Sequence, residues 1–323
     1  MKIVCVGDAY ITDVMMRDGL RPFIGKDDSV TIFFFGDPDQ TVMRDMAKFI
    51  EAGGREEIEV PDGLFEAAPK LKAIMSCRGG LENIDVQAAT EHNVIISNNP
   101  AHNANAVAEF TIGLILAETR NICRSNYALK NGEWRKTYPY TASTIKELTV
   151  LTVGIVGYGS IGRLVAYKLS VFGCRILVAD PFLKECKEDY VTLVPMDELL
   201  AQADIVTLHA RSNGAVMTDR EFGLMKQNSY LINTARPYLV DFEAFLRAMD
   251  SGKLLGAAFD VFETEPVIPE AYRKYDNITI TNHLGGLTIN SYSDAPGYAI
   301  KNYLDYINGK ADLAFFVNRN QLA

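Results

Sequence analysis

Histidine and cysteine are scarce in this sequence, and the way they are placed argues against a resident metal. Four histidines and five cysteines are present, with no CxxC pair and no paired spacing of the two residue types that would bind zinc. The odd, scattered set of cysteines is typical of free thiols in a reducing compartment. We therefore expect a cytoplasmic protein without a metal centre.

Long apolar runs and an N-terminal leader are also missing. The most apolar stretches, TIFFFG and TIGLILA, are far shorter than the roughly 18 residues of a membrane span. The first strand-like run, KIVCVGD, is too short for the apolar part of a signal peptide and turns acidic too soon. The sequence thus predicts no membrane association.

Basic charge is in deficit. Lysine and arginine number 32 against 41 acidic residues, which gives a formal net charge of −9. Nucleic acids and anionic membranes favour basic surfaces, so neither is an expected partner. A small anionic ligand is still compatible with this composition, because it responds to the local field of a cleft rather than to the net charge.

What is present is enough apolar sequence for two domains. The chain has 323 residues, 48% of them apolar, and domains average roughly 150 residues. Short apolar runs alternate with helical patterns, which is typical of an α/β protein with open parallel sheets. In the N-terminal part, the pattern predicts strands at 2–8, 31–37, 71–77 and 93–99, and helices at 40–54 and 86–92.

The rest of the chain continues this alternation after one long helix. An apolar stretch from Ala104 to Gly132 predicts a single helix, and the polar, aromatic segment 133–147 predicts an ordered arm. Further strands are then expected at 150–156, 175–180, 204–210, 229–235, 254–261 and 277–283. A C-terminal helix and a final strand around FFVN complete the prediction.

A glycine-rich turn predicts a dinucleotide site. Gly157, Gly159 and Gly162 follow a strand and open a helix over 161–172, and the next strand ends in Asp180. The glycines allow the tight turn, the approach of backbone amides to a pyrophosphate, and close helix packing. A carboxylate at Asp180 would bind the ribose hydroxyls and repel a 2′-phosphate. The pattern therefore favours NAD over NADP.

Residues suited to hydride transfer follow the later strands. Ligands of such sheets bind beyond the carboxyl ends of the strands, where the sequence places Arg236, Asp260, Glu265 and His283. Arginine can bind a substrate carboxylate through two parallel hydrogen bonds and polarise a neighbouring carbonyl. Histidine can exchange a proton with a hydroxyl, and a glutamate beside it can orient the ring and stabilise the imidazolium.

These strings together resemble the D-isomer-specific 2-hydroxyacid dehydrogenase family, which includes phosphoglycerate and D-glycerate dehydrogenases. The spacing from Arg236 to Glu265 and from Glu265 to His283 matches the layout of the family, and the resemblance is weakest near the N-terminus, over 1–60. The matching strings are ENID (82–85), NNPAHNANAVAEF (98–110), VGIVGYGSIG (153–162), INTAR (232–236), GAAFDVFETEP (256–266) and TNHLGG (281–286).

The resemblance implies two Rossmann-like domains, with the NAD-binding domain inserted into a flavodoxin-like substrate domain. The substrate-binding domain would comprise 1–102 and 288–323, and the NAD-binding domain 103–287. The resemblance further implies an NAD-dependent oxidoreductase that interconverts a D-2-hydroxy acid and its 2-oxo acid. We expect a homodimer formed through the NAD-binding domains. Since the chain ends soon after FFVN, we expect no C-terminal regulatory domain.

Residue roles follow at the matching positions. Arg236, Glu265 and His283 would be catalytic, and Asp260 would contact the nicotinamide carboxamide or support the site. The implied cofactor-binding residues are Gly157, Gly159, Ser160, Ile161, Gly162, Asp180, His209, Thr234, Ala235, Arg236, Asp260, His283, Gly285 and Gly286. The implied substrate-binding residues are Ser76, Cys77, Arg78, Gly79, Gly80, Asn103 and Arg236. For His209, a packing role is an equal alternative.

Some positions depart from the family pattern, and two other functions remain open. Pro237 and Asn282 stand where the family usually has glycine and proline, and Arg78 lies in a loop that is often small or apolar. One alternative is an NAD(H)-sensing binding protein of the corepressor type. The other is a dehydrogenase for a small inorganic anion such as phosphite.

Arg78 raises a question of substrate size. The two glycines after it let backbone amides bind a carboxylate without a charged side chain. Arg78 would then be a second cation, in addition to Arg236, available to a distal phosphate or carboxylate of a substrate larger than lactate. The alternative is a surface arginine paired with Glu82.

Overall fold

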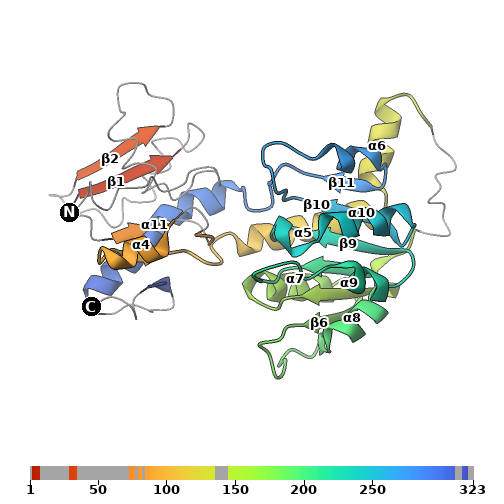
Figure 1. Cartoon of the computed structure of the whole chain (residues 1–323), viewed down its shortest axis with the longest axis horizontal. Coiled ribbons are helices and arrows are strands. Elements are labelled where there is room, and N and C mark those ends of the chain that lie inside the picture. Colours follow the sequence, from red (N-terminus) through yellow and green to blue (C-terminus); the bar gives the residue numbers. More distant parts are fainter. Residues whose placement is uncertain are drawn as a thin grey trace. The chain divides into compact units, whose positions relative to one another are not determined.

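The structure is a computed structural model, and it describes residues 2–7, 29–34, 73–76, 79–81, 84–134, 145–309 and 315–318. The chain divides into two compact units, one formed by Met1–Asn103 with Leu287–Ala323 and the other by Ala104–Gly286 (Figure 1). The helix predicted at 40–54 and most of the predicted arm lie outside the described residues. Within the described residues, no helix is both long and apolar enough to cross a membrane.

The second unit is built on a seven-stranded sheet in which every neighbouring pair is parallel. The strands are β5 (Thr152–Val156), β6 (Arg175–Ala179), β7 (Thr192–Leu193), β8 (Ile205–Leu208), β9 (Ser229–Asn233), β10 (Leu254–Phe259) and β11 (Ile278–Ile280). Their order is β11-β10-β9-β8-β5-β6-β7. The chain starts at β5 and winds outward in both directions, so β5 and β8 flank the switch point where such sheets bind ligands.

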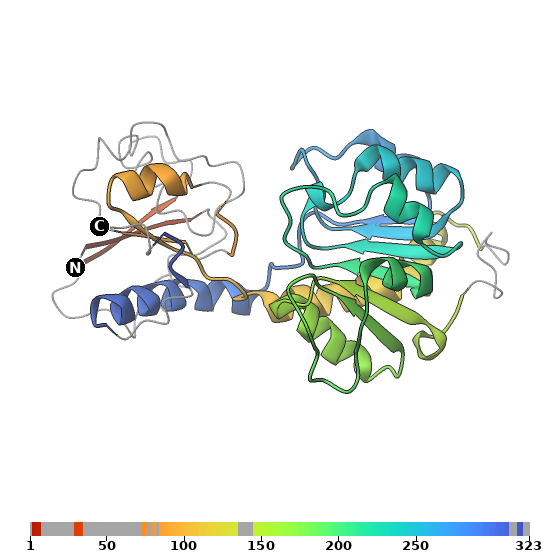
Figure 2. The ribbon, with the colours of Figure 1, turned by 60° about the horizontal axis from the view of Figure 1, so that its bottom comes forward.

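Helices cover both faces of this sheet, which explains why its strands are apolar throughout. On one face lie α5 (Ala104–Thr119) and α7 (Ser160–Ser170). The other face carries α8 (Met196–Gln202), α9 (Asp219–Leu224) and α10 (Phe242–Asp250). Figure 2 shows the strands enclosed between these layers. Short 3-10 turns complete the unit at Leu148–Val150, Pro237–Leu239 and Glu270–Lys274.

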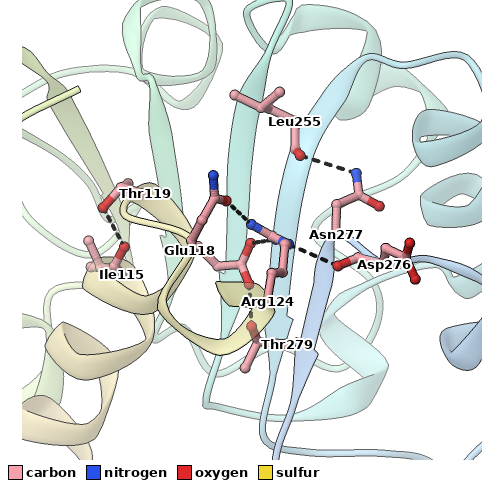
Figure 3. A network of polar contacts seen from close by, with 9 residues as sticks. Ile115, Glu118, Thr119, Arg124, Leu255, Asp276, Asn277 and Thr279 are labelled. Carbon is pink, nitrogen blue, oxygen red and sulfur yellow. Dashed lines mark hydrogen bonds and ion pairs between the residues drawn. The ribbon is translucent and has the colours of Figure 1, made fainter. Parts of the chain in front are cut away.

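The single long helix predicted over 104–132 was wrong. The structure has two helices, α5 and α6 (Ile122–Lys130), separated at Asn121, whose φ of 54° is left-handed. Asparagine adopts this conformation more readily than most residues. The turn is fixed by Arg124, whose guanidinium bonds to Asn121 and to Glu118 (Figure 3). The same two side chains also contact distant residues, since Arg124 donates to Asp276 O and Glu118 accepts from Thr279. Local apolar periodicity does not reveal a break of this kind.

The described residues of the first unit form two parallel strand pairs. These are β1 (Lys2–Gly7) with β2 (Ser29–Phe34), and β3 (Ala73–Met75) with β4 (Ile95–Ser97). The helices within its described residues are α4 (Val86–Glu91) and α11 (Ile289–Ile307). The predicted FFVN strand forms one antiparallel bridge, between Phe316 and Ser97. Asn318, which is 1% exposed, secures this C-terminal segment through Ile96 N and Val94 O at 2.9 Å each.

Candidate active site

The glycine-rich turn joins β5 to α7, and two of its three glycines meet steric demands within the chain. Gly157 has a φ of 92°, and a Cβ there would overlap the backbone of Ala210. A Cβ on Gly162 would overlap the carbonyl oxygen of Gly157, while the same position on Gly159 faces open space. Helix α7 begins directly after Gly159 without a side-chain cap. Its N-terminus can therefore receive a phosphate group, as the sequence predicts.

Asp180 follows β6 beside this turn. Its Oδ2 accepts a hydrogen bond from Tyr158 N at 2.8 Å, and its Oδ1 accepts one from Phe182 N at 2.9 Å. A carboxylate has about four lone-pair positions, so two backbone contacts leave room for the two hydroxyls of a ribose. The glycine-rich turn, the N-terminus of α7 and the Asp180 carboxylate are together suited to bind the adenosine diphosphate half of NAD.

His209 lies on the other side of the turn, after β8. Its Nε2 is 2.9 Å from Thr207 Oγ1, and its Nδ1 is shielded from water with no hydrogen-bond partner. Burial lowers the pKa of His209 to about 3, so the ring is neutral at pH 7. A neutral histidine with one unsatisfied nitrogen next to the glycine-rich turn is consistent with a ligand-facing position.

A histidine–carboxylate pair lies beyond β10 and β11. His283 Nδ1 is 2.7 Å from Glu265 Oε2, and the side chains are 32% and 22% exposed. The other oxygen, Glu265 Oε1, accepts a hydrogen bond from Phe262 N at 2.8 Å. One carboxylate oxygen of Glu265 is thus fixed by the backbone, while the other holds the imidazole of His283. The structure thus brings together two residues that follow different strands, as the sequence analysis expects.

Asp260 supports the loop that carries His283. This residue is 1% exposed, and it accepts hydrogen bonds from Thr281 Oγ1 at 2.6 Å, Leu284 N at 2.8 Å and Gly285 N at 2.7 Å. The contacts bracket His283, whose backbone has a left-handed φ of 54°. Such a conformation persists in a non-glycine residue only where its surroundings enforce it. The sequence predicted that Asp260 either contacts the nicotinamide carboxamide or supports the site, and these contacts favour the supporting role.

Arg236 follows the neighbouring strand, β9. Its Nη1 donates to Ala235 O at 2.9 Å, and its backbone is extended, as the following Pro237 requires. Thr234, two positions earlier, is 7% exposed and pairs with Thr111 Oγ1 of α5 at 2.8 Å. Since β9, β10 and β11 are adjacent and parallel, Arg236, Asp260 and His283 lie at one edge of the sheet.

The predicted substrate loop belongs to the first unit and is described only in part. Ser76 is 3% exposed, and its backbone N donates to Ser97 O at 2.9 Å. Gly79 O accepts a hydrogen bond from Asn98 Nδ2 at 2.9 Å, a support that the sequence analysis did not identify. Cys77 and Arg78 lie outside the described residues, so the distal-anion hypothesis stays a prediction. Asn103 is the last residue of this unit before α5.

The described part of the chain contains no cluster of three or more histidine, cysteine or acidic side chains suited to a metal ion. A parallel sheet with a glycine-rich turn, a ribose-binding acid and a histidine–carboxylate pair at its carboxyl edge defines a dinucleotide-dependent dehydrogenase. Comparison with known proteins specifies the family. Residues 112–285 match the model of the D-isomer specific 2-hydroxyacid dehydrogenase NAD binding domain.

Relatives of known name agree with this match. A glyoxylate reductase from Thermofilum pendens is 35% identical over 269 residues, covering 80% of this chain and 78% of that protein. A hydroxypyruvate reductase from Thermotoga maritima is 37% identical over 240 residues, covering 72% and 77%. The crystal structure of a glyoxylate reductase from Paecilomyes thermophila superposes with a TM-score of 0.80 at 25% identity, over 99% of each chain.

The chain belongs to the D-isomer-specific 2-hydroxyacid dehydrogenase family. It is an NAD-dependent oxidoreductase that interconverts D-2-hydroxy acids and 2-oxo acids, and its α/β fold with an NAD-binding Rossmann domain is confirmed. The relatives support this activity and give no support to the corepressor-like or phosphite-oxidising alternatives.

Proposed function

We propose that Arg236, Glu265 and His283 carry the reaction. The observation behind this proposal is the 2.7 Å contact between His283 Nδ1 and Glu265 Oε2 at the sheet edge that also holds Arg236. Arg236 would bind the carboxylate of the 2-oxo acid and polarise the adjacent carbonyl. His283 would donate a proton from Nε2 to the carbonyl oxygen during reduction and take it back during oxidation, while Glu265 stabilises the imidazolium.

We assign the NAD site to the carboxyl ends of the strands in the second unit. NAD, when bound, supplies or accepts the hydride. Gly157, Gly159, Ser160, Ile161 and Gly162 would hold its pyrophosphate, and the α7 N-terminus provides the positive potential for this. Asp180 would bind the adenosine ribose, with His209 nearby. The residues proposed for the nicotinamide side are Thr234, Ala235, Arg236, His283, Gly285 and Gly286, with Asp260 supporting the loop that carries His283.

Asp180 is expected to set the cofactor preference. The wild-type enzyme should use NADH better than NADPH, and Asp180→Ala should weaken NADH binding about tenfold or more, as expected for loss of charge-assisted hydrogen bonds. The variant should also narrow the gap to NADPH, because the repulsion of a 2′-phosphate disappears. Steady-state KM values for both cofactors measure this.

A matched control for that measurement is Asp204→Ala. Asp204 also accepts a backbone hydrogen bond, from Thr152 N at 2.9 Å, but it lies at the amino end of β8. Its replacement should leave the cofactor ratio unchanged. Equal or better turnover of the wild type with NADPH would refute the role of Asp180.

For the first unit (Met1–Asn103 with Leu287–Ala323), we propose substrate binding through the loop Ser76–Gly80 and through Asn103. Oxidation of NADH with glyoxylate, pyruvate, hydroxypyruvate, branched-chain and phosphorylated 2-oxo acids would identify the substrate. If Arg78 binds a distal anion, Arg78→Ala should lower kcat/KM for a doubly anionic substrate about 10- to 150-fold, equivalent to roughly 1.5–3 kcal/mol. Glyoxylate has no distal group and should be nearly unaffected. Equal losses for both would contradict the distal-anion hypothesis.

We further propose a cytoplasmic homodimer formed through the NAD-binding units. Large apolar side chains gather on and after α6, where Ile122, Tyr127, Leu129 and Trp134 are 51% to 74% exposed. Several exposed large apolar side chains within one short stretch of the chain favour an interaction surface there. Sedimentation equilibrium should give the mass of two chains, and Tyr127→Glu with Leu129→Lys should reduce it to one. A wild-type mass of one chain at micromolar concentration would contradict the dimer.

The scattered cysteines support the proposed cytoplasmic location.

A further inference from the structure

Asn233 ends β9 and spans the turn that leads to Arg236. This residue is 0% exposed. Its Oδ1 accepts a hydrogen bond from Ala235 N at 3.0 Å, and its Nδ2 donates one to Arg236 O at 3.0 Å. Its own carbonyl oxygen accepts a hydrogen bond from Asp260 N, also at 3.0 Å. The buried side-chain amide therefore fixes the backbone at Ala235 and Arg236, and the main-chain carbonyl of the same residue ties the turn to Asp260.

The chemistry of the contact is specific to asparagine. The side chain needs an acceptor for an N–H and a donor for a carbonyl, in one plane and at one length. Aspartate would place an oxygen against the carbonyl of Arg236, and serine is too short to reach both groups. Pro237, the next residue, has no N–H and cannot supply a replacement hydrogen bond for the turn.

The turn controls where the guanidinium of Arg236 lies. Arginine is long and flexible, so its position depends on its backbone and on the contacts along its side chain. Here the backbone is held by Asn233, and Nη1 is anchored on Ala235 O, which is a carbonyl of the same turn. Loosening the turn would displace both anchors at once, and a displacement of about 1 Å in a positioned group can cost about 100-fold in rate.

We propose that Asn233 is a positioning residue for the reaction, acting through Arg236. This inference rests on the proposed role of Arg236 in binding the 2-oxo acid. Asn233 lies within the INTAR string (232–236), but the sequence alone assigns a role only to Thr234, Ala235 and Arg236 of that string. The function of Asn233 follows from the two side-chain contacts that only the folded turn displays.

The test compares Asn233→Ser and Asn233→Asp with Ser229→Ala. Ser229 is a matched control, because it begins the same strand, is 0% exposed, and donates through Oγ to a backbone carbonyl, that of Lys226, at 2.7 Å. For the 2-oxo acid with the highest wild-type rate, the Asn233 variants should lose about 10- to 100-fold in kcat/KM. Their Kd for NADH should change less than about threefold. Ser229→Ala should lower the melting temperature and leave kcat/KM unchanged.

A double variant separates this inference from the proposed function. In an Arg236→Ala background, Asn233→Ser should cause almost no further loss, because the group it positions is gone. If the losses in kcat/KM of the two single variants add fully in the double variant, the positioning role is overturned and the proposed function is not. Equal kcat/KM for the Asn233 variants and Ser229→Ala would have the same consequence. Wild-type kcat/KM in Arg236→Ala would overturn the proposed function and the inference with it. Loss of NADH binding in both Asn233 variants would assign the residue to folding and also overturn the inference.

Discussion

Replacing His283 by asparagine is expected to lower kcat for reduction of a 2-oxo acid by about 10²- to 10⁴-fold, the usual contribution of a general acid. Asparagine can still donate a hydrogen bond toward Glu265, but it has no ring nitrogen that can deliver a proton to the carbonyl oxygen. The Kd for NADH should change little, because the glycine-rich turn and Asp180 lie elsewhere on the sheet edge. Single-turnover kinetics with saturating NADH measure the chemical step directly.

Glu265→Gln tests whether the pair acts as a unit. The decrease in kcat should be smaller for Glu265→Gln than for His283→Asn. The double variant should have about the same kcat as His283→Asn alone, because the effects of residues that work together are not additive. His92→Asn is the matched control, since His92 is an exposed residue at the C-terminus of α4. Full additivity in the double variant would remove Glu265 from the mechanism. An unaffected rate in His283→Asn would remove His283.

The sequence predicted much of the second unit because its strands and its glycine-rich turn follow local rules. Buried parallel strands are continuous apolar runs, and the steric demands on Gly157 and Gly162 are met within one strand–turn–helix unit. The contact between His283 and Glu265 was also predictable, because each follows its own strand and adjacent strands end at a common edge.

Other features depend on contacts that no local pattern records. Asn233 was not identified, because its role comes from its burial and from the turn that it spans. The separation of α5 from α6 was missed for the same reason. The helical pattern resumes after Asn121, while the break itself lies beside buried polar groups that also contact the distant residues Asp276 and Thr279.

Those groups form a buried network between α5, α6, the edge strand β11 and its neighbour β10 (Figure 3). Glu118 is 0% exposed and bonds to both Arg124 and Thr279 Oγ1. Arg124, 6% exposed, also donates from Nε to Asp276 O at 2.9 Å. The fit is close, because a Cβ on Gly256 of β10 would overlap the Glu118 carboxylate. Burial raises the pKa of Glu118, while Arg124 and the Thr279 hydroxyl act in the opposite direction.

Arg124→Met is therefore expected to lower the free energy of unfolding by about 3–5 kcal/mol, because it leaves Glu118 buried without its cation. The double variant Glu118→Leu/Arg124→Met should be much more stable than this single variant, since it removes the uncompensated charge. Chemical denaturation of the three proteins, followed by circular dichroism, compares these free energies. A double variant as unstable as Arg124→Met would show that packing, and not the unpaired carboxylate, causes the loss.

The cost of Arg124→Met should also depend on pH. Burial already raises the pKa of Glu118, and loss of the guanidinium removes the main opposing influence, so the pKa lies still further above its value in the unfolded chain. The folded variant then binds more protons than the unfolded chain between these two pKa values, so its stability falls as pH rises through that window. The deficit relative to wild type should be smaller at pH 5 than at pH 8, and Glu118→Gln/Arg124→Met should lose this dependence. A deficit that is constant from pH 5 to 8 would mean that Glu118 does not take up a proton when its partner is removed.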